Sequence, residues 1–372
     1  MTDPRVTRLA QLLINYSCGL KPGEKVLLEA IDVPHDFAIE VAKAAHDAGG
    51  TALVLLKSNR INRALMCFGS PEQMALIADV EKLQMENVQC YIGARGSDNV
   101  SELSDVPLEK QKAYESQVWK RVHLDVRIRR TRWVVLRWPT ASMAQLAEMS
   151  TEAFEDFYFN VCTLDYAKMS RAMQPLKALL ERTDRVRIKG PGETDLSFSV
   201  KGIPAVCCDG KLNIPDGEVF TAPVRTSVNG VIRFNSPTLY RGTTHNDVRL
   251  TFRDGRIVEA SSSNTPRLNE VLDTDEGARF VGEFAIGFNP WCTRPMKDIL
   301  FDEKIAGSIH LTPGNAYDEA DNGNKSQVHW DLVLRQDRES GGGELWFDDR
   351  LVRKDGRFVV DELLALNPEN LR

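Results

Sequence analysis

The sequence predicts an α/β N-terminal domain with a mostly parallel sheet, followed by a β-rich (α+β) C-terminal domain. Its 372 residues exceed what one hydrophobic core usually organises, so we expect two domains, at 1–188 and 189–372. Apolar strand patterns alternate with amphipathic helical patterns in the first half, whereas short strand patterns separated by turn residues fill the second. A composition of 42 % hydrophobic and 27 % charged residues is typical of globular proteins and excludes disordered or collagen-like classes.

The first domain is predicted from alternating strand and helix signals. A helix opens at Pro34 and ends at Gly49-Gly50, and Ser70-Pro71-Glu72-Gln73 combines an N-cap, a first-turn proline and a capping-box glutamine. Helical patterns dominate again over 143–180. The expected strands are Lys25–Glu29, Thr51–Leu56, Val88–Ile92 and Trp133–Leu136. Because helices separate these strands, right-handed crossovers and a parallel sheet follow.

The second domain is predicted from period-two patterns and turn chemistry. Strand-like segments begin at 184–189 and 195–200, and one helix is expected at Pro266–Leu272. The expected turns are Asp209-Gly210, Pro215-Asp216-Gly217, Asn229-Gly230, Asp254-Gly255 and Asp355-Gly356.

Charge and cysteine usage restrict the partners and the compartment. The net charge of −6 is unevenly distributed, because residues 1–190 carry 26 basic and 24 acidic residues and residues 191–372 carry 21 and 29. The second half is therefore acidic, and we expect no nucleic-acid partner. The short basic run at 127–132 is expected to be a solvated face. No run approaches the ~20 apolar residues of a membrane span, and residues 1–5 do not resemble a secretory signal. Seven scattered cysteines suit a reducing compartment, so a cytoplasmic location is expected.

Two of the six histidines, His310 and His329, have sequence neighbours that suggest metal binding. His329 and Asp331 flank Trp330 in a strand-like run, where residues two apart share a face, so an imidazole and a carboxylate project together. His310 lies on a second strand-like segment. The other four are read as surface or core histidines, with His245 expected on the surface of a hairpin; they are His35, His46, His123 and His245.

Three glutamates in apolar or turn settings extend this cluster. Glu218 begins a strand after a turn, Glu283 lies inside an apolar strand, and Glu303 follows Phe301-Asp302. A buried carboxylate needs a cation or a hydrogen-bonded partner, so each glutamate alone could instead pair with an arginine. With Asp331 they carry four negative charges, which two divalent ions would neutralise.

The same segments resemble the M29 metalloaminopeptidases. The resemblance rests on NIPDGEVFTAP at 213–223, VGE at 281–283, the stretch from Asp302-Glu303 through His310 to Tyr317, and SQVHWD at 326–331. It extends over most of the chain. It implies an α/β N-terminal domain, a β-rich catalytic C-terminal domain and a homodimer.

The resemblance also implies residue roles. Glu283 would be the bridging ligand or general base, and Tyr317 would stabilise the tetrahedral intermediate. The spacing from Glu303 to His310 is longer than in some members, so Asp302 is an alternative to Glu303. The implied metal ligands are Glu218, Glu283, Glu303, His310, His329 and Asp331.

The function implied is removal of N-terminal residues from peptides by a metal-bridged hydroxide, with two divalent ions (Zn, Co, Mn or Mg) as cofactors. One alternative is an iron-dependent ring-cleaving dioxygenase on a related scaffold, which Glu218, Glu283 and Tyr317 disfavour. The other is a non-enzymatic dimer stabilised by metal, in which Tyr317 would have no role.

Overall fold

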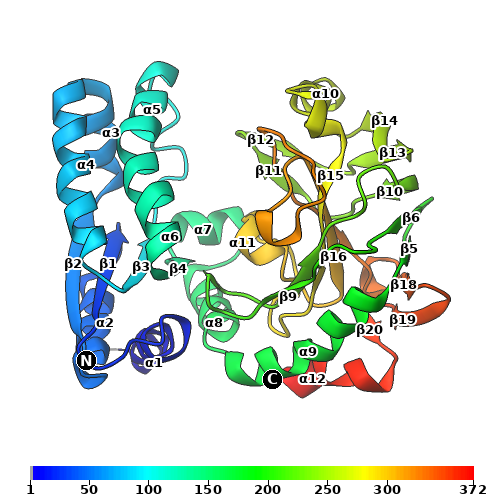
Figure 1. Cartoon of the computed structure of the whole chain (residues 1–372), viewed down its shortest axis with the longest axis horizontal. Helices are drawn as coiled ribbons and strands as arrows, with labels where there is room; N and C mark the ends of the chain where they lie inside the picture. Colours follow the sequence, from blue (N-terminus) through cyan, green and yellow to red (C-terminus); the bar gives the residue numbers. More distant parts are fainter. Residues whose placement is uncertain (1–2) are drawn as a thin grey trace. The chain divides into compact units, whose positions relative to one another are not determined.

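The computed structural model describes residues 3–372 and divides into two compact units (Figure 1). The first unit is Met1–Thr163 with Gly210–Pro215, and the second is Leu164–Asp209 with Asp216–Arg372. These units are defined by contacts, and the first change of unit, after Thr163, comes earlier in the chain than the domain boundary expected after residue 188. The boundary at 188 remains a prediction.

The first unit is built on a five-stranded sheet in the order β2-β1-β3-β4-β8, with every neighbouring pair parallel. Four strands match those expected, and the fifth is supplied by the return of the chain at residues 210–215. The strands are β1 (Lys25–Ile31), β2 (Thr51–Lys57), β3 (Cys90–Arg95), β4 (Arg132–Arg137) and β8 (Asn213–Ile214). The α/β expectation is therefore confirmed.

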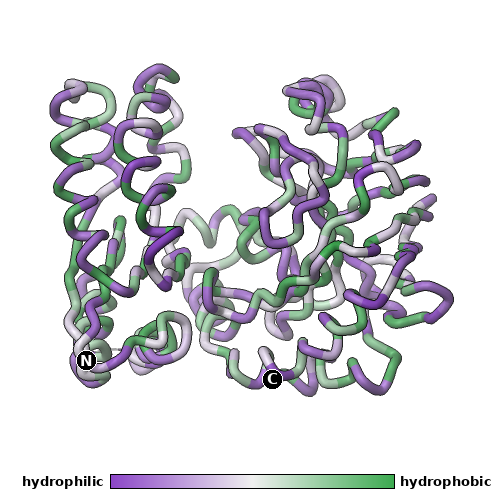
Figure 2. Tube along the Cα trace, viewed as in Figure 1, coloured by the Kyte–Doolittle hydropathy of each residue, from purple (hydrophilic) through white to green (hydrophobic). Residues whose placement is uncertain are grey.

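Helices connect these strands, as the pattern predicts. Ser70 caps α4, because its Oγ accepts the Gln73 backbone N–H at 3.2 Å, and Pro71 fills the first turn. The helices α3 and α4 show both hydrophobic and hydrophilic stretches along their length (Figure 2). The helical segments are α1 (Pro4–Leu12), η1 (Leu13–Ser17), α2 (His35–Asp47), α3 (Asn59–Phe68), α4 (Pro71–Glu86), α5 (Leu108–Tyr114), η2 (Glu115–Arg127), α6 (Ile128–Arg130), α7 (Ala141–Leu146) and α8 (Thr151–Cys162).

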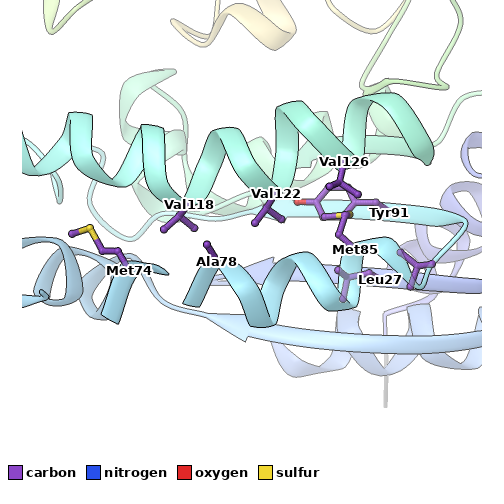
Figure 3. Close-up of a cluster of buried hydrophobic side chains, with 9 residues drawn as sticks. Leu27, Met74, Ala78, Met85, Tyr91, Val118, Val122 and Val126 are labelled. Atoms are coloured by element: carbon purple, nitrogen blue, oxygen red, sulfur yellow. The ribbon is translucent and has the colours of Figure 1, made fainter. Parts of the chain in front are cut away.

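One face of this sheet is covered by α4 and η2. Their buried side chains meet Leu27 of β1 and Tyr91 of β3 in a single cluster (Figure 3). Apolar residues of α4 recur at helical spacing, Met74, Ala78 and Met85, so one face of the helix is buried.

The second unit contains two antiparallel sheets, in the orders β14-β13-β10-β6-β5-β18-β19-β20 and β17-β16-β15-β9-β7. The β-rich expectation is thus confirmed. The eight-stranded sheet has β5 (Arg185–Lys189), β6 (Asp195–Ser199), β10 (Asn229–Arg233), β13 (Arg249–Arg253), β14 (Arg256–Ser261), β18 (Glu344–Phe347), β19 (Arg350–Lys354) and β20 (Arg357–Phe358). The five-stranded sheet has β7 (Val206–Cys208), β9 (Glu218–Thr221), β15 (Val281–Gly287), β16 (Ser308–Pro313) and β17 (Leu332–Arg335).

Helices and a hairpin complete this unit. The expected helix at 266–272 is α10, and the helical pattern before residue 180 continues through α9. The remaining segments are α9 (Tyr166–Arg182), β11 (Thr238–Tyr240), β12 (Thr243–His245), α10 (Thr265–Leu272), η3 (Glu276–Arg279), α11 (Ile299–Asp302), η4 (Asp318–Ala320), η5 (Arg338–Ser340), η6 (Asp361–Leu366) and α12 (Pro368–Leu371).

Three local expectations are wrong. Asn229-Gly230 lies inside β10 and is not a turn, because both residues pair with β6. The expectation of a solvated basic run at 127–132 fails only at Arg127, which is buried with its guanidinium 4.3 Å from the Trp133 ring centroid. Arg129, Arg130 and Arg132 are exposed, as expected. His245 is fully buried in its hairpin, 5.0 Å from the Trp330 ring centroid.

Within the described residues, no helix is both long and apolar enough to cross a bilayer.

Candidate metal centre

Neighbouring strands of the five-stranded sheet bring the predicted ligands together. Glu218 is the first residue of β9, Glu283 lies on β15 and His310 on β16. His329 forms an isolated bridge with Gly314, and Asp331 stands directly before β17. Since β9, β15, β16 and β17 are consecutive in the sheet, residues far apart in the sequence share one site.

His310 lies between two buried glutamates. Its Nδ1 is 3.6 Å from Glu218 Oε2 and its Nε2 is 3.3 Å from Glu283 Oε1. Both glutamates are only 4 % exposed and His310 is fully buried. Glu218 Oε2 and His310 Nδ1 are buried without a hydrogen-bond partner. Such atoms cost free energy unless a further group binds them.

His329 and Asp331 form the second part of the cluster. His329 Nε2 is 3.4 Å from both Glu283 Oε2 and Asp331 Oδ1, and its Nδ1 is 2.9 Å from the Asn315 carbonyl oxygen. An Nδ1–H donated to that carbonyl leaves Nε2 free as a ligand. Thr312 Oγ1 donates to Asp331 Oδ1 at 2.5 Å. Trp330 points away and stacks on Tyr240, as the two-residue alternation predicts.

Glu283 connects the two parts, because one carboxylate oxygen faces His310 and the other faces His329. Burial alone would raise the pKa of Glu283, but the two histidines lower it to about 2. Burial opposes protonation of the histidines, yet the surrounding carboxylates raise the pKa of His310 to about 10 and that of His329 to about 9. In this buried site the carboxylates stabilise the protonated histidines, and the histidines stabilise the ionised Glu283.

The structure distinguishes Glu303 from Asp302. A Glu303 carboxylate oxygen lies within 4.8 Å of ligand atoms of His310 and Asp331. The Asp302 oxygens instead accept the backbone N–H groups of Met296 and Lys297, at 2.5 and 2.9 Å. Glu303 therefore belongs to the cluster, and Asp302 orders the loop before it.

Tyr317 stands at the rim of the cluster. Its ring centroid is 4.6 Å from that of His329 and 5.7 Å from that of Phe220, and the residue is 46 % exposed. It can therefore be reached from solvent while remaining in contact with the His329 ring.

A buried lysine that the sequence pattern does not predict lies in the same cluster. Lys304 is fully buried, and its Nζ donates to Glu218 Oε1 at 2.5 Å and to Glu303 Oε1 at 2.6 Å, with Asp216 Oδ1 at 3.5 Å. Burial opposes its charge, but these carboxylates raise the pKa of Lys304 well above its usual range. The only local signal was a charged residue next to apolar Ile305, which is too common to predict a contact with Glu218.

The donor set fits divalent metal ions. Two groups of three ligands, Glu218–Glu283–His310 and Glu283–His329–Asp331, each bring one ligand atom per residue to within 4.8 Å of the others, and Glu283 belongs to both. The mixed carboxylate and imidazole ligands suit zinc, cobalt or manganese. The unpartnered atoms of Glu218 and His310 face each other, where a cation would satisfy both.

Comparison with known proteins supports this reading. A family model described as thermophilic metalloprotease (M29) matches residues 2–358. Aminopeptidase T of Thermus thermophilus is 27 % identical over 406 aligned residues, covering 95 % of this chain and 98 % of that protein.

Solved structures share the fold. Wild-type AmpT from Thermus thermophilus has a TM-score of 0.77 at 24 % identity, covering 96 % of this chain and 99 % of its own. A 2,5-dihydroxypyridine dioxygenase from Pseudomonas putida KT2440 has a TM-score of 0.62 at 12 % identity, covering 98 % of this chain and 99 % of its own. The fold alone therefore does not separate peptidase from dioxygenase. The chain belongs to the M29 family of metalloproteases.

Proposed function

We propose that this chain removes N-terminal residues from peptides at the cluster described above, with two divalent ions as cofactors. Glu218, Glu283 and His310 would hold one ion, and Glu283, His329 and Asp331 the other, with Glu303 as a further ligand. The observation that carries the proposal is Glu283, whose two carboxylate oxygens face the two histidines separately.

When bound, such ions would supply a hydroxide nucleophile, by lowering the pKa of a water, and would polarise the scissile carbonyl. The chain's own groups would perform the remaining steps. A carboxylate of the cluster, with Glu283 or Glu303 as candidates, would pass the proton to the leaving amine. Tyr317 would donate its hydroxyl hydrogen to the developing oxyanion, since a phenol can do so without competing for a cation.

The carboxylates of the cluster also give a reason for amino-terminal specificity. Two divalent ions would neutralise the four ligand carboxylates, and Lys304 offsets Asp216. A hydroxide would then leave one negative charge that attracts a free α-ammonium group, whereas an acylated N-terminus is neutral. We therefore expect hydrolysis of peptides and aminoacyl-anilides with a free N-terminus and little hydrolysis of their N-acetylated forms.

The test is an aminoacyl-anilide assay of purified protein, with elemental analysis of the same sample. We expect activity that a chelator abolishes and that Zn, Co, Mn or Mg restores, together with two bound ions per chain. His329→Ala should abolish both activity and one bound ion, whereas His46→Ala, which removes an exposed histidine, should change neither. Full activity in metal-free protein would contradict the proposal, and so would one iron with oxygen uptake.

From the resemblance to the M29 metalloaminopeptidases we also infer that the protein forms a homodimer and acts on peptides. We infer a cytoplasmic location as well. Light scattering on the eluting protein measures the oligomeric state. A monomer at micromolar concentration would contradict the inference.

A further inference from the structure

The two proposed cation positions differ in what lies next to their ligands. Lys304 Nζ contacts Glu218 Oε1 directly, and the other oxygen of that carboxylate faces His310. One oxygen of Glu218 is thus already paired with a positive charge, and only Oε2 remains for a cation.

The second position is oriented by neutral groups. Asp331 accepts a hydroxyl hydrogen from Thr312, and His329 is held by the backbone carbonyl of Asn315. Partners of this kind orient a ligand without adding positive charge. Among the described residues, Lys304 forms no hydrogen bond or ion pair with Asp331 or His329. It approaches this position only through Glu303, whose carboxylate lies within 4.8 Å of ligand atoms of His310 and Asp331.

A fixed positive charge next to one position weakens cation binding there. Like charges a few ångströms apart repel strongly in a buried site, where water does not screen them. Lys304 is fully buried, and its ammonium is held by two short contacts and by Asp216 at 3.5 Å, so it cannot move into solvent. The repulsion is therefore a permanent property of the Glu218 position.

We propose that Lys304 makes the two metal positions unequal, so that the ion at Glu218–Glu283–His310 is weakly held and exchangeable while the ion at Glu283–His329–Asp331 is tightly held. This inference rests on the proposed function, because it assumes that both positions bind a divalent ion. Lys304 is a positioning residue, since it acts through Glu218 and Glu303 and not on the substrate.

The test is chelator competition on zinc-loaded protein, with bound zinc measured by mass spectrometry. We expect the wild type to release one ion at a chelator concentration at least tenfold lower than the other. Glu218→Gln should remove the weakly held ion, and His329→Ala the tightly held one. Lys304→Met, which keeps the side-chain length and removes the charge, should tighten the weak ion at least tenfold, so that the two release steps merge.

Two control variants separate charge from folding. Lys304→Arg keeps the charge and should keep two separate release steps. Lys57→Met removes another largely buried lysine, paired with Glu81 at 2.7 Å in the first unit, and should leave both steps unchanged. If Lys304→Met does not fold, the zinc content of Glu218→Gln and His329→Ala still shows which of the two positions holds its ion more tightly.

Each outcome has one reading. Simultaneous release of both ions from the wild type would overturn the inference, and so would loss of the tight ion in Glu218→Gln. A Lys304→Met protein that binds two ions with wild-type affinities would also overturn it. In all three cases the peptidase could still hydrolyse anilides, whereas wild-type protein that binds no divalent ion would overturn the proposed function itself.

Discussion

At the scale of single residues, the site depends on how each carboxylate and imidazole is oriented. Thr312 orients Asp331, the Asn315 carbonyl orients His329, and Lys304 holds one oxygen of Glu218. These partners leave His329 Nε2 facing Asp331 and Glu283. Partners of metal ligands commonly decide affinity as much as the ligands themselves.

Tyr317→Phe should lower kcat while both ions remain bound. In the proposed mechanism the phenol hydroxyl stabilises an oxyanion, and loss of one such donor costs about 2–4 kcal/mol of transition-state stabilisation. The measurement is kcat on an aminoacyl-anilide together with metal content. Tyr114→Phe, in the first unit, is the matched control. Wild-type kcat in Tyr317→Phe would show that the hydroxyl has no catalytic role.

His123 predicts a pH dependence of stability in the first unit. Burial lowers the pKa of His123 to about 4; Glu29 opposes this shift, and Arg127, Lys57 and Arg95 add to it. Arg127 Nε donates to His123 Nδ1 at 3.2 Å, which requires the neutral ring. The unfolded state binds a proton below about pH 6.5 and the folded state only below about 4.

Stability should therefore fall as pH decreases from about 6.5 to 4, by up to about 3 kcal/mol for this group. Urea unfolding at several pH values, monitored in the first unit, measures it. His123→Gln should flatten the dependence in this window. A wild-type slope retained in that variant would assign the effect to other groups.

At the scale of elements, closely approaching segments position the ligands. Gly314 has φ +112°, and a Cβ there would lie 2.0 Å from the Val328 carbonyl oxygen, next to the bridge that holds His329. Only glycine allows this approach without moving 328–329.

Gly314→Ala should therefore displace His329 and weaken metal binding, with a loss of about 1–3 kcal/mol in stability. Gly202→Ala is the control, because Gly202 also has positive φ but nothing within 4 Å of its added Cβ. The two variants share the backbone cost, so a difference in zinc affinity isolates the clash. Equal zinc affinity would show that the approach does not position His329.

Local signals predicted elements better than they predicted contacts. The Ser70 cap, α10 and the alternation across Trp330 depend on residues near one another in sequence, and all were predicted correctly. The strand β8 joins the parallel sheet from residue 213, and Lys304 reaches Glu218 across 86 positions. Both depend on long-range packing that no local pattern encodes.

The site itself was accessible to sequence reasoning for a different reason. Burying a carboxylate in an apolar strand costs free energy unless a cation or a hydrogen-bond donor binds it, so Glu283 and Glu218 were each candidate metal ligands from their local sequence alone. Their convergence with His310, His329 and Asp331 is a property of strand order, which the family resemblance supplied and periodicity could not. The sequence could not decide whether Asp302 or Glu303 is the further ligand. The backbone N–H groups that Asp302 accepts in the structure decide for Glu303.

At the scale of the whole molecule, the proposed ligands all belong to the second unit. Ligand binding to the native state stabilises it by about 2.7 kcal/mol at a hundred times Kd. Chelation should therefore lower the melting temperature and increase hydrogen exchange in strands β9, β15, β16 and β17, with little change in the parallel sheet of the first unit. His329→Ala should show a smaller response to chelator. Equal loss of protection in both units would contradict a site confined to the second.

The most direct measurement is a crystal structure of the zinc- or cobalt-loaded protein with anomalous scattering at the metal edge. Two peaks are expected, one bounded by Glu218, Glu283 and His310 and the other by Glu283, His329 and Asp331, with Glu283 touching both. A single peak, or density away from these side chains, would contradict the assignment of a two-metal peptidase site.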